Sequence, residues 1–515
     1  MNDLRILVVD DKPNWRRELQ KILSEIGDGV HVDVAPNYSA ASEWVASRSY
    51  DLAVVDLALS GDWADAREAD QQGMDLLRLL RDSRRNRDCG LIVLTGYGTN
   101  ARTRQALRDY AAFDFVEKDR FEAGQFVETA RAAIRDAYLK QAAARATTRY
   151  RLTITFGREH LIGSELIGPD RRAIYGADTP LRFDVEDLAR RADNLDLLIR
   201  QGGPEVWRPE ARAIGVAVYT TLAKDQRILG DLVAARALAQ RFSDLWLQFS
   251  GPSVGLGVPF ELLRDGNDAL GLAHILTRRL TQTGVSLSRK PEPFYDFLKS
   301  LLDEGERLRI LIVGANSDGA IPSAEVEATT LADEIKASLG RLGIRHTIDL
   351  LVGDAANYGR IRKSLREGHY HIFHYAGHGW HEQASPEFSG LVLCDGDGLR
   401  ILTAADLNLL VRDTDLRLVY LSCCLGAQTA SHVGRGDFYG TLEALARGDV
   451  PFVLGYRWTV ADRPAARLVG DFYRSLWRAF SPGEALLHAR ISASMEAKGR
   501  DDETWASPVL VAQNL

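Results

Sequence analysis

The sequence has only four cysteines among its 515 residues, Cys89, Cys394, Cys423 and Cys424. None of them forms a Cys-x-x-Cys pair, which argues against a disulfide framework and against a zinc ribbon. Cys423 and Cys424 are adjacent, and because neighbouring residues of an extended chain point to opposite faces, they do not readily bridge to each other. The thiols are therefore predicted to be free, as in a reducing compartment.

Long apolar segments are also missing. No run of about 18 apolar residues occurs, so we expect no membrane-spanning helix and no membrane partner. The first apolar run starts at residue 5, which leaves no room for a secretion signal ahead of it. Together with the free cysteines, these absences predict a cytoplasmic protein.

A strong charge of either sign is absent too. The formal net charge is −7, and 26% of residues are charged and 45% hydrophobic, as in ordinary globular proteins. Arginines cluster at 81–87, but acidic residues interrupt the run, which favours a solvated helix end over a binding surface. Because no helix-turn-helix pattern or basic face is found, we expect no nucleic acid partner. The length suggests about three domains.

Short apolar runs separated by amphipathic stretches fill the N-terminal part of the chain. Strands that alternate with helices predict a doubly wound parallel sheet, with functional groups at the carboxyl ends of the strands. The predicted strands are residues 5–9, 52–55, 91–94 and 113–116, and the predicted helices include residues 15–26 and 74–81.

Each of these predicted strands is followed by a polar residue. Asp10 and Asp11 follow the first strand, Asp56 the second, Thr95 the third and Lys118 the fourth. Carboxylate oxygens are the ligands that Mg²⁺ prefers, and the ion in turn offsets the charge of a phosphoryl group. Three carboxylates, a hydroxyl and an ammonium group at one edge of a sheet therefore suit Mg²⁺ and a phosphoryl group.

This order of residues resembles the response-regulator receiver domain, over residues 1–135. The resemblance implies that Asp56 accepts a phosphoryl group and that Asp10, Asp11 and Asp56 bind Mg²⁺. It also implies a partner that donates the phosphoryl group, either a histidine kinase or a small phosphodonor.

The same resemblance implies that Thr95 and Lys118 contact the phosphoryl oxygens and that Phe115 is the aromatic switch residue. Two departures from the family pattern leave a second interpretation open, a receiver fold that no longer accepts phosphate. An acidic insertion lengthens the loop at residues 57–73, and Asp119 stands where receivers usually have proline.

The central part of the chain carries little chemistry. Residues 136–150 continue a helical, alanine-rich pattern and are predicted to form a stiff connector, with a passive spacer as the alternative. Residues 151–300 mix strand-like and helix-like runs without a cluster of His, Cys or paired carboxylates. A Lys-Pro-Glu-Pro sequence from residue 290 is the clearest break, and it separates residues 151–300 from residues 301–515.

A histidine and a cysteine follow two apolar runs in the last segment. His378 comes after Ile372–Tyr375, and Cys424, 46 residues further on (378 to 424), comes after Leu418–Leu421. Parallel strands buried on both faces have such runs, and α/β enzymes place reactive side chains beyond their carboxyl ends. A general acid and a nucleophile would then meet at one edge of a sheet, with a spacing close to that of caspases. The pattern predicts a cysteine protease.

From about residue 150 to residue 515 the chain resembles the CHAT domain, a caspase- and separase-like peptidase family. The matching segments are VPFELLRD, AGHG, LTAADL, LSCC, LGYRWTVAD and DFY. The resemblance implies a caspase-like α/β sandwich at 301–515, preceded by a non-catalytic, pseudo-caspase-like α/β half at 151–300. It also implies that Cys424, the last residue of LSCC, is the nucleophile, and that Cys423 takes the usual alanine position.

Thiol chemistry and the resemblance together assign the remaining roles. Cys424 would attack the scissile carbonyl, and His378 would protonate the departing amine, with no cofactor required. The backbone amides of Gly379 and Cys424 would stabilise the oxyanion. Asp462 matches a separase aspartate that lines the pocket for an arginine side chain, which implies cleavage after Arg or Lys. A surface or helix-capping aspartate is the alternative for that residue.

Metal sites are weaker alternatives in this segment. His374 and His378 have a spacing that can bind a metal on a helix, but the pattern around them is that of a strand and no third ligand is evident. We expect His374 to orient or pack behind His378. Asp395 and Asp397 are expected to form a turn, with Ca²⁺ binding as the alternative.

The sequence as a whole predicts a receiver-regulated cysteine endopeptidase in bacterial signalling or defence, which cleaves a protein substrate after Arg or Lys. The second interpretation is a catalytically inactive signalling scaffold, in which the CHAT-like part binds partners.

Overall fold

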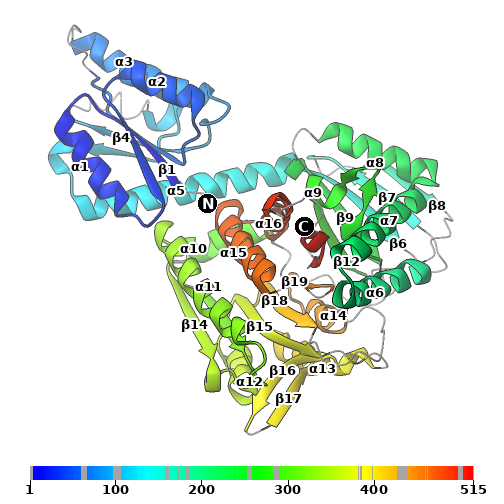
Figure 1. Cartoon of the computed structure of the whole chain (residues 1–515). Coiled ribbons are helices and arrows are strands. Elements are labelled where there is room, and N and C mark those ends of the chain that lie inside the picture. The colour runs from blue at the N-terminus through cyan, green and yellow to red at the C-terminus, as the bar shows by residue number, and fades with distance from the viewer. Residues whose placement is uncertain are drawn as a thin grey trace. The chain divides into compact units, whose positions relative to one another are not determined.

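The computed structural model (Figure 1) describes most of the chain. By its internal contacts the chain forms two units. The N-terminal unit comprises Met1–Ala142 and Lys336–Arg345, and the C-terminal unit comprises Ala143–Ile335 and His346–Leu515. The described residues are 4–59, 66–96, 106–156, 162–170, 173–179, 185–239, 242–251, 258–281, 290, 292–380, 382, 385–396, 398–425, 439–458, 460, 462–496 and 503–513.

The N-terminal unit contains a parallel sheet with strand order β2-β1-β3-β4-β5. All four predicted strands are present, and a fifth strand that the sequence analysis missed, β2, lies at one edge. The strands are β1 (Leu4–Val9), β2 (Val30–Ala35), β3 (Leu52–Val55), β4 (Gly90–Thr95) and β5 (Asp114–Glu117), and the helices are α1 (Pro13–Ser24), α2 (Tyr38–Ser47), α3 (Ala66–Asp82) and α5 (Ala123–Thr148).

Burial explains why the N-terminal apolar runs form strands. Every residue of β3 and β4 is buried, as expected for parallel strands that helices cover on both faces. Proline at position 13 starts α1, since its missing N–H is not needed in the first turn of a helix. This arrangement brings the carboxyl ends of β1, β3 and β4 together at one edge of the sheet.

The C-terminal segment of α11 (Pro322–Arg341) and the turn after it belong to the N-terminal unit. Within that unit, Arg135 of α5 donates hydrogen bonds from Nη1 to the carbonyl oxygens of Leu342 (2.7 Å) and Gly343 (3.1 Å). Two helices, α5 and α11, therefore have residues in both units. The predicted connector, residues 136–150, lies almost entirely in α5.

The C-terminal unit is built on one mixed sheet of 13 described strands, to which both of its predicted halves contribute. Its order is β14-β13-β15-β18-β19-β20-β12-β9-β6-β7-β8. Beside this order, β16 pairs with β15, and β17 pairs with β16. The bounds are β6 (Tyr150–Phe156), β7 (Ile162–Ile167), β8 (Ala173–Thr179), β9 (Leu245–Gly251), β12 (Ile275–Leu280), β13 (Leu308–Ala315), β14 (His346–Val352), β15 (Ile372–Trp380), β16 (Gly390–Asp395), β17 (Gly398–Thr403), β18 (Leu418–Leu425), β19 (Phe452–Tyr456) and β20 (Pro508–Ala512).

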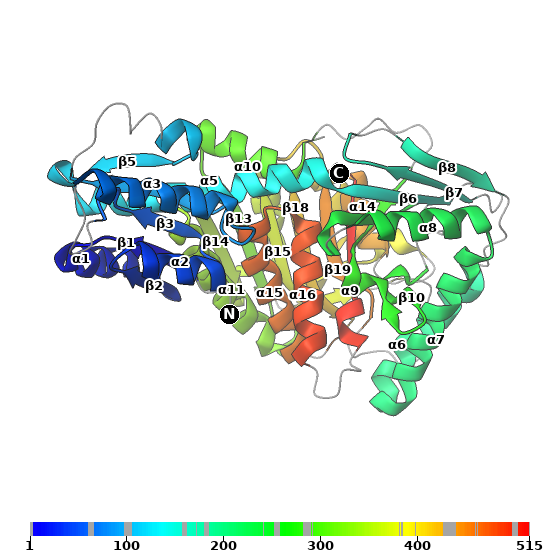
Figure 2. The same cartoon turned by 90° about the horizontal axis from the view of Figure 1, so that it is seen from above.

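Strand β20 joins the two groups of parallel strands in this sheet. It runs antiparallel to β19 and parallel to β12, so the strands on its two sides run in opposite directions. Helices cover the sheet, and α15 (Asp462–Ala479) and α16 (Pro482–Glu496) lie side by side on it (Figure 2). The other helices of the unit are α6 (Val185–Gln201), α7 (Pro204–Ala223), α8 (Gln226–Leu238), α9 (Leu270–Ala273), α10 (Phe294–Asp303), α12 (Tyr358–Glu367), α13 (Ala404–Val411) and α14 (Tyr439–Arg447).

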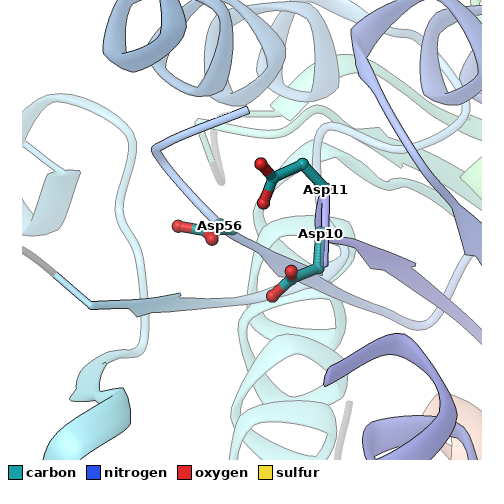
Figure 3. Close-up of side chains that lie close together, drawn as sticks. All are labelled: Asp10, Asp11 and Asp56. Carbon is teal, nitrogen blue, oxygen red and sulfur yellow. The ribbon is translucent and has the colours of Figure 1, made fainter. Parts of the chain in front are cut away.

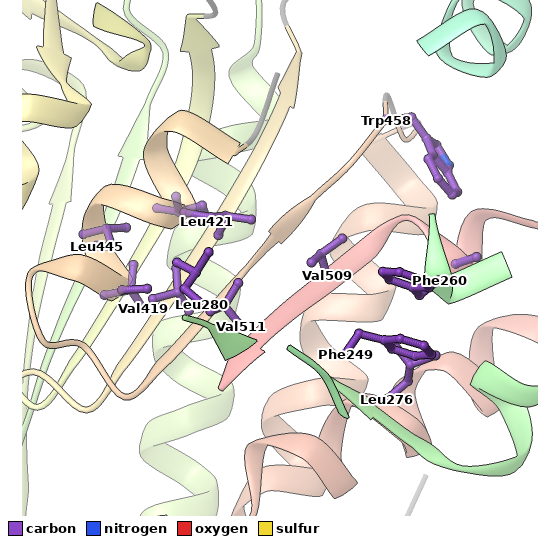
Figure 4. Packing of buried hydrophobic residues seen from close by; sticks show 14 of the residues in the cluster. Phe249, Phe260, Leu276, Leu280, Val419, Leu421, Leu445, Trp458, Val509 and Val511 are labelled. Carbon is purple, nitrogen blue, oxygen red and sulfur yellow. The ribbon is translucent and has the colours of Figure 1, made fainter. Parts of the chain in front are cut away.

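One hydrophobic core runs through this unit, and Figure 4 shows part of it. The rings of Phe249 and Phe260 stack with centroids 3.9 Å apart and an interplanar angle of 3°. Val511 of β20 lies in the same core as Val419 and therefore connects the packing of the two strand groups. Within the described ranges, none of the helices is both long enough and apolar enough to cross a membrane.

A buried ion pair links strand β12 of the sheet to the 3-10 turn Phe260–Leu262. Glu261 and Arg278 are both fully buried, and Arg278 Nε donates to Glu261 Oε1 at 2.9 Å. Burial by itself would raise the pKa of Glu261, but the positive charges of Arg278, Arg490 and Arg457 lower it. The carboxylate is therefore charged inside the core.

Replacing this carboxylate by an amide, Glu261→Gln, should destabilise the unit by about 3–5 kcal/mol, because it leaves buried arginine charge without its partner. Thermal unfolding followed by circular dichroism would measure the loss as a lower midpoint. The control is Glu367→Gln, which removes an exposed carboxylate paired with Arg366 and should leave the midpoint unchanged. Equal midpoints for both variants would contradict the prediction.

Candidate functional site

Three aspartates lie together at the carboxyl edge of the N-terminal sheet (Figure 3). Asp10 and Asp11 follow β1, and Asp56 follows β3, so the parallel topology brings them side by side. One carboxylate oxygen from each lies within 4.8 Å of those of the other two. Asp10 and Asp56 are buried and Asp11 is partly exposed. Three hard oxygen donors at this separation fit Mg²⁺.

Lys118 contacts two of these aspartates, which agrees with its predicted place at the same edge of the sheet. Its Nζ lies 2.6 Å from Asp10 Oδ2 and 2.6 Å from Asp56 Oδ2. The contact with Asp56 has the geometry of a hydrogen bond, whereas Asp10 Oδ2 accepts no aligned hydrogen bond. Burial raises the pKa of Asp10, although the positive charge of Lys118 and the hydrogen bond from Lys12 N lower it in part. A second cation near Asp10 would therefore stabilise its charged form.

Thr95 and Phe115 also lie where the sequence analysis expected them in the sheet. Thr95 is the last residue of β4 and is buried, and Phe115 in β5 packs against the hydrophobic core of the unit. In the lengthened loop at 57–73, residues 60–65 lie outside the described part of the chain. Asp119, which stands where receivers usually have proline, lies in the short 3-10 turn Lys118–Arg120.

In the C-terminal unit, β15 and β18 are neighbouring parallel strands, and their register pairs His378 with Cys424. Gly379 pairs with Leu425 in the same register and with Leu391 of β16 on its other side. The two residues that the sequence analysis predicted to react therefore occupy one rung of the sheet. The side chain of Cys424 lies outside the described part of the structure.

The other cysteine of the pair, Cys423, lies in the core. It is 2% exposed and pairs in register with Gly377. Because successive residues of a strand alternate between the faces of a sheet, position 424 belongs to the opposite face, which is that of position 378. A buried thiol in apolar surroundings is chemically inert. The register therefore separates the two adjacent cysteines by face.

His378 contacts a carboxylate that the sequence analysis did not identify. Its Nε2 lies 3.2 Å from Oδ2 of Asp318, in the loop after β13. The contact is an ion-pair distance without the alignment of a hydrogen bond, because His378 Nε2 has no hydrogen-bond partner by angle. Partial burial would raise the pKa of Asp318, but the hydrogen bond from Ala320 N and the charge of His378 lower it overall. Asp318 is therefore an anion next to the imidazole.

His374 lies deeper in the same strand and is fully buried. Its Nε2 lies 3.2 Å from Oε1 of Glu327 in α11, and its Nδ1 lies 3.4 Å from the hydroxyl of Tyr473 in α15. The ring of Tyr420 packs against it at 5.2 Å between centroids. Among the described residues, three potential metal ligands come together only in the N-terminal unit. His374 belongs instead to a buried polar and aromatic cluster.

Two further predicted elements can be placed only in part. Asp462 is the first residue of α15, and its side chain lies outside the described part of the structure. The predicted turn at Asp395 is confirmed, because the β16–β17 hairpin ends with the pair Asp395 and Gly398, and Gly396 between them has φ +62°. Asp397 is outside the described residues.

Family models match two parts of this chain, and together they define a signalling protein with a caspase-like, protease-related domain. The CHAT domain model matches residues 212–513, and the response regulator receiver domain model matches residues 6–131. Because the first match covers more than half of the sequence, the chain belongs to the CHAT domain family, with a receiver domain fused to it.

Solved structures similar to the chain cover about a quarter of it. A CheY-like response regulator receiver protein from Methanospirillum hungatei JF-1 is 20% identical, with 27% of this chain and 99% of that chain covered and a TM-score of 0.23. A sensor protein from Polaromonas sp. JS666 is 28% identical, with 26% and 98% covered and a TM-score of 0.22. A comparison with curated proteins gives no match.

Proposed function

We propose that this protein is a cysteine endopeptidase whose activity the receiver domain regulates, in bacterial signalling or defence. The observation that carries the proposal is the register of β15 and β18, in which His378 and Cys424 share one rung at the carboxyl ends of adjacent strands. The exposed fraction of the His378 side chain, 15%, leaves the imidazole within reach of a substrate. A nucleophile and a proton donor at one edge are what acyl transfer requires.

In this proposal His378 takes the thiol proton of Cys424, the sulfur attacks the scissile carbonyl carbon, and the carbonyl oxygen becomes an oxyanion. The amides of Gly379 and Cys424 stabilise the oxyanion by donating hydrogen bonds. His378 gives a proton to the amine as the C–N bond breaks, which leaves a thioester on Cys424. Water then attacks the thioester with loss of its proton to His378, so that a carboxylic acid and the thiol are released.

The receiver domain supplies the regulatory input in this proposal. Asp10, Asp11 and Asp56 would hold Mg²⁺, whose role when bound is to offset the negative charge of an incoming phosphoryl group. Asp56 accepts that group from a histidine kinase or a small phosphodonor, and Lys118 and Thr95 contact its oxygens. The 2.6 Å contact of Lys118 with Asp56 supports these roles, because it already places a cation at the acceptor carboxylate.

Cleavage after Arg or Lys is the proposed specificity, with Asp462 at the base of the pocket. A carboxylate binds a guanidinium through two parallel hydrogen bonds and discriminates against neutral or acidic side chains. We expect fluorogenic peptides with Arg at P1 to be cleaved at least about a hundredfold faster than peptides with Asp at P1. The rates of the full-length protein on a set of peptides that differ only at P1 would measure this preference.

Substitution of Asp462 tests whether that residue determines the specificity. Asp462→Asn should remove most of the preference for Arg by raising KM for that peptide. The control is Asp471→Asn in the same helix, whose carboxylate binds Arg474 and Ser492 and should not affect P1 preference. A wild-type preference for Asp at P1 would exclude the proposed pocket.

A further inference from the structure

We propose that Asp318 is a positioning residue for His378, so that the reacting pair is completed by a third group from the neighbouring strand β13. The inference rests on the proposed function, since it gives Asp318 a part in that reaction. Its basis is the 3.2 Å separation between Asp318 Oδ2 and His378 Nε2. Strands β13, β15 and β18 are consecutive in the sheet, so three adjacent strands would each contribute one residue.

The carboxylate of Asp318 is held in place by its own turn. Its Oδ1 accepts a hydrogen bond from Ala320 N at 3.0 Å, which leaves Oδ2 to face the imidazole. A second hydrogen bond, from Ile321 N to Asn316 Oδ1 at 2.9 Å, closes the same turn. Such side-chain contacts with nearby backbone groups fix a turn without help from a distant element.

The turn is also attached to the β16 strand that flanks the site. Ser317 Oγ donates to the carbonyl oxygen of Val392 at 2.9 Å, and Cys394 Sγ donates to the carbonyl oxygen of Ser317 at 3.2 Å. Beneath the turn, Gly314 lets α11 approach β13 closely, since a Cβ at this position would lie 2.7 Å from Ala324 O. The carboxylate therefore stands on a rigid support rather than on a freely moving loop.

A carboxylate at one ring nitrogen determines which nitrogen remains for chemistry. If Nε2 carries a proton toward Asp318, the opposite nitrogen, Nδ1, is the one that exchanges a proton with the thiol and the leaving amine. The anion also stabilises the imidazolium, which is the form that donates the proton. The unaligned contact in the free protein is compatible with this role, because catalytic hydrogen bonds often tighten only when substrate binds.

Other groups around His378 do not replace Asp318. Tyr375 donates a hydrogen bond from its hydroxyl to the carbonyl oxygen of His378 at 2.9 Å, which fixes the backbone and not the ring. Cys424 is the reaction partner in register. A second Asp–His pair exists at His369 and Asp415, 2.9 Å apart, but both side chains are largely exposed, whereas Asp318 is 30% exposed and His378 is 15% exposed.

The test is Asp318→Asn in the full-length protein. Asparagine keeps an oxygen for the hydrogen bond from Ala320 N and removes only the charge that faces His378. We expect kcat on an Arg peptide to fall about tenfold or more with little change in KM, and the alkaline limb of the kcat profile to move down by about one pH unit. Asp318→Glu should recover part of the activity. The matched control, Asp415→Asn, should leave kcat and the profile unchanged.

A second measurement separates this inference from the proposed function. In an NMR titration of the imidazole protons, the His378 midpoint should shift to lower pH in Asp318→Asn, whether or not any peptide is cleaved. A wild-type protein that cleaves peptides, with an Asp318→Asn variant of equal kcat and equal midpoint, overturns the inference alone. A loss of kcat with an unchanged pH profile and an unchanged midpoint also overturns it, because it indicates only support of the loop. If the His378 midpoint is lower in Asp318→Asn than in wild type, but wild type cleaves no peptide, the proposed function is refuted instead.

Discussion

Replacing Cys424 by alanine should abolish peptide cleavage while the protein stays folded. The sulfur of Cys424 is the proposed nucleophile, and without it no thioester can form, so the expected activity falls to background, a loss of up to about a millionfold. The backbone of position 424 continues the β18 ladder in either variant. Hydrolysis of a fluorogenic Arg peptide, measured beside circular dichroism, would check the prediction.

The adjacent cysteine provides a matched control for this experiment. Cys423 is buried in the core and lies on the other face of the strand, so Cys423→Ala should retain cleavage with a modest loss of stability. Peptide mapping after reaction with a thiol-reactive probe should find the label at position 424 in wild type and in Cys423→Ala, whatever the labelling of the partly exposed Cys394. Labelling at Cys423 would contradict the assignment of the nucleophile. Equal cleavage by wild type and Cys424→Ala would contradict Cys424 as the nucleophile, whereas no cleavage by either would favour the scaffold interpretation.

The second large effect is expected at the receiver. Incubation with Mg²⁺ and acetyl phosphate should add one phosphoryl group to the wild type and none to Asp56→Asn. The amide cannot form the acyl phosphate that a carboxylate forms, and it no longer supplies the negative charge that pairs with Lys118. Intact-protein mass spectrometry, with the phosphoryl group expected as a gain of about 80 Da, would measure the modification.

The control for this experiment is Asp109→Asn, which changes an exposed aspartate paired with Arg108 and should be modified as fully as wild type. Removal of Mg²⁺ by EDTA should suppress modification of the wild type, because the three aspartates then lack the cation that offsets the phosphoryl charge. Modification of Asp56→Asn to the wild-type level would show that another residue accepts the group. Failure of wild type to be modified under these conditions would favour a receiver fold that has lost this chemistry.

The positions of the site residues could be predicted from the sequence where they follow apolar runs. Asp10 and Asp56 come directly after such runs and Lys118 comes two residues after one, and the parallel topology then brings strand ends to one edge. The same reasoning placed His378 and Cys424 on neighbouring strands. In both cases the prediction needed only the direction of the strands and the point at which each one ends.

The edge strand β2 was missed because its pattern is weaker. Its sequence, VHVDVA, alternates between apolar and polar residues, and most of its residues are only partly buried. Continuous apolar runs are typical of central strands, whereas an edge strand with one solvated face shows alternation. The alternation of apolar and polar residues at 30–35 is the signal that indicates strand β2.

Asp318 could not be found from the sequence, because no spacing or motif relates it to His378. The two residues are brought together by the pairing of β13 with β15 and by the shape of one turn after β13. Many apolar strands are followed by an aspartate. Which side chain that aspartate meets in the fold depends on the order of the strands in the sheet. That order is a tertiary property, which a single sequence determines but does not display.

The place of β20 has a consequence for how the protein is made. This strand is formed by Pro508–Ala512, yet it lies in the interior of the sheet between β19 and β12. It is the last of the described strands in the sequence, so a ribosome must first make residues 508–512 before β20 can join the two strand groups. A chain that ends before Pro508 would leave the facing edges of β19 and β12 without the strand that pairs with both.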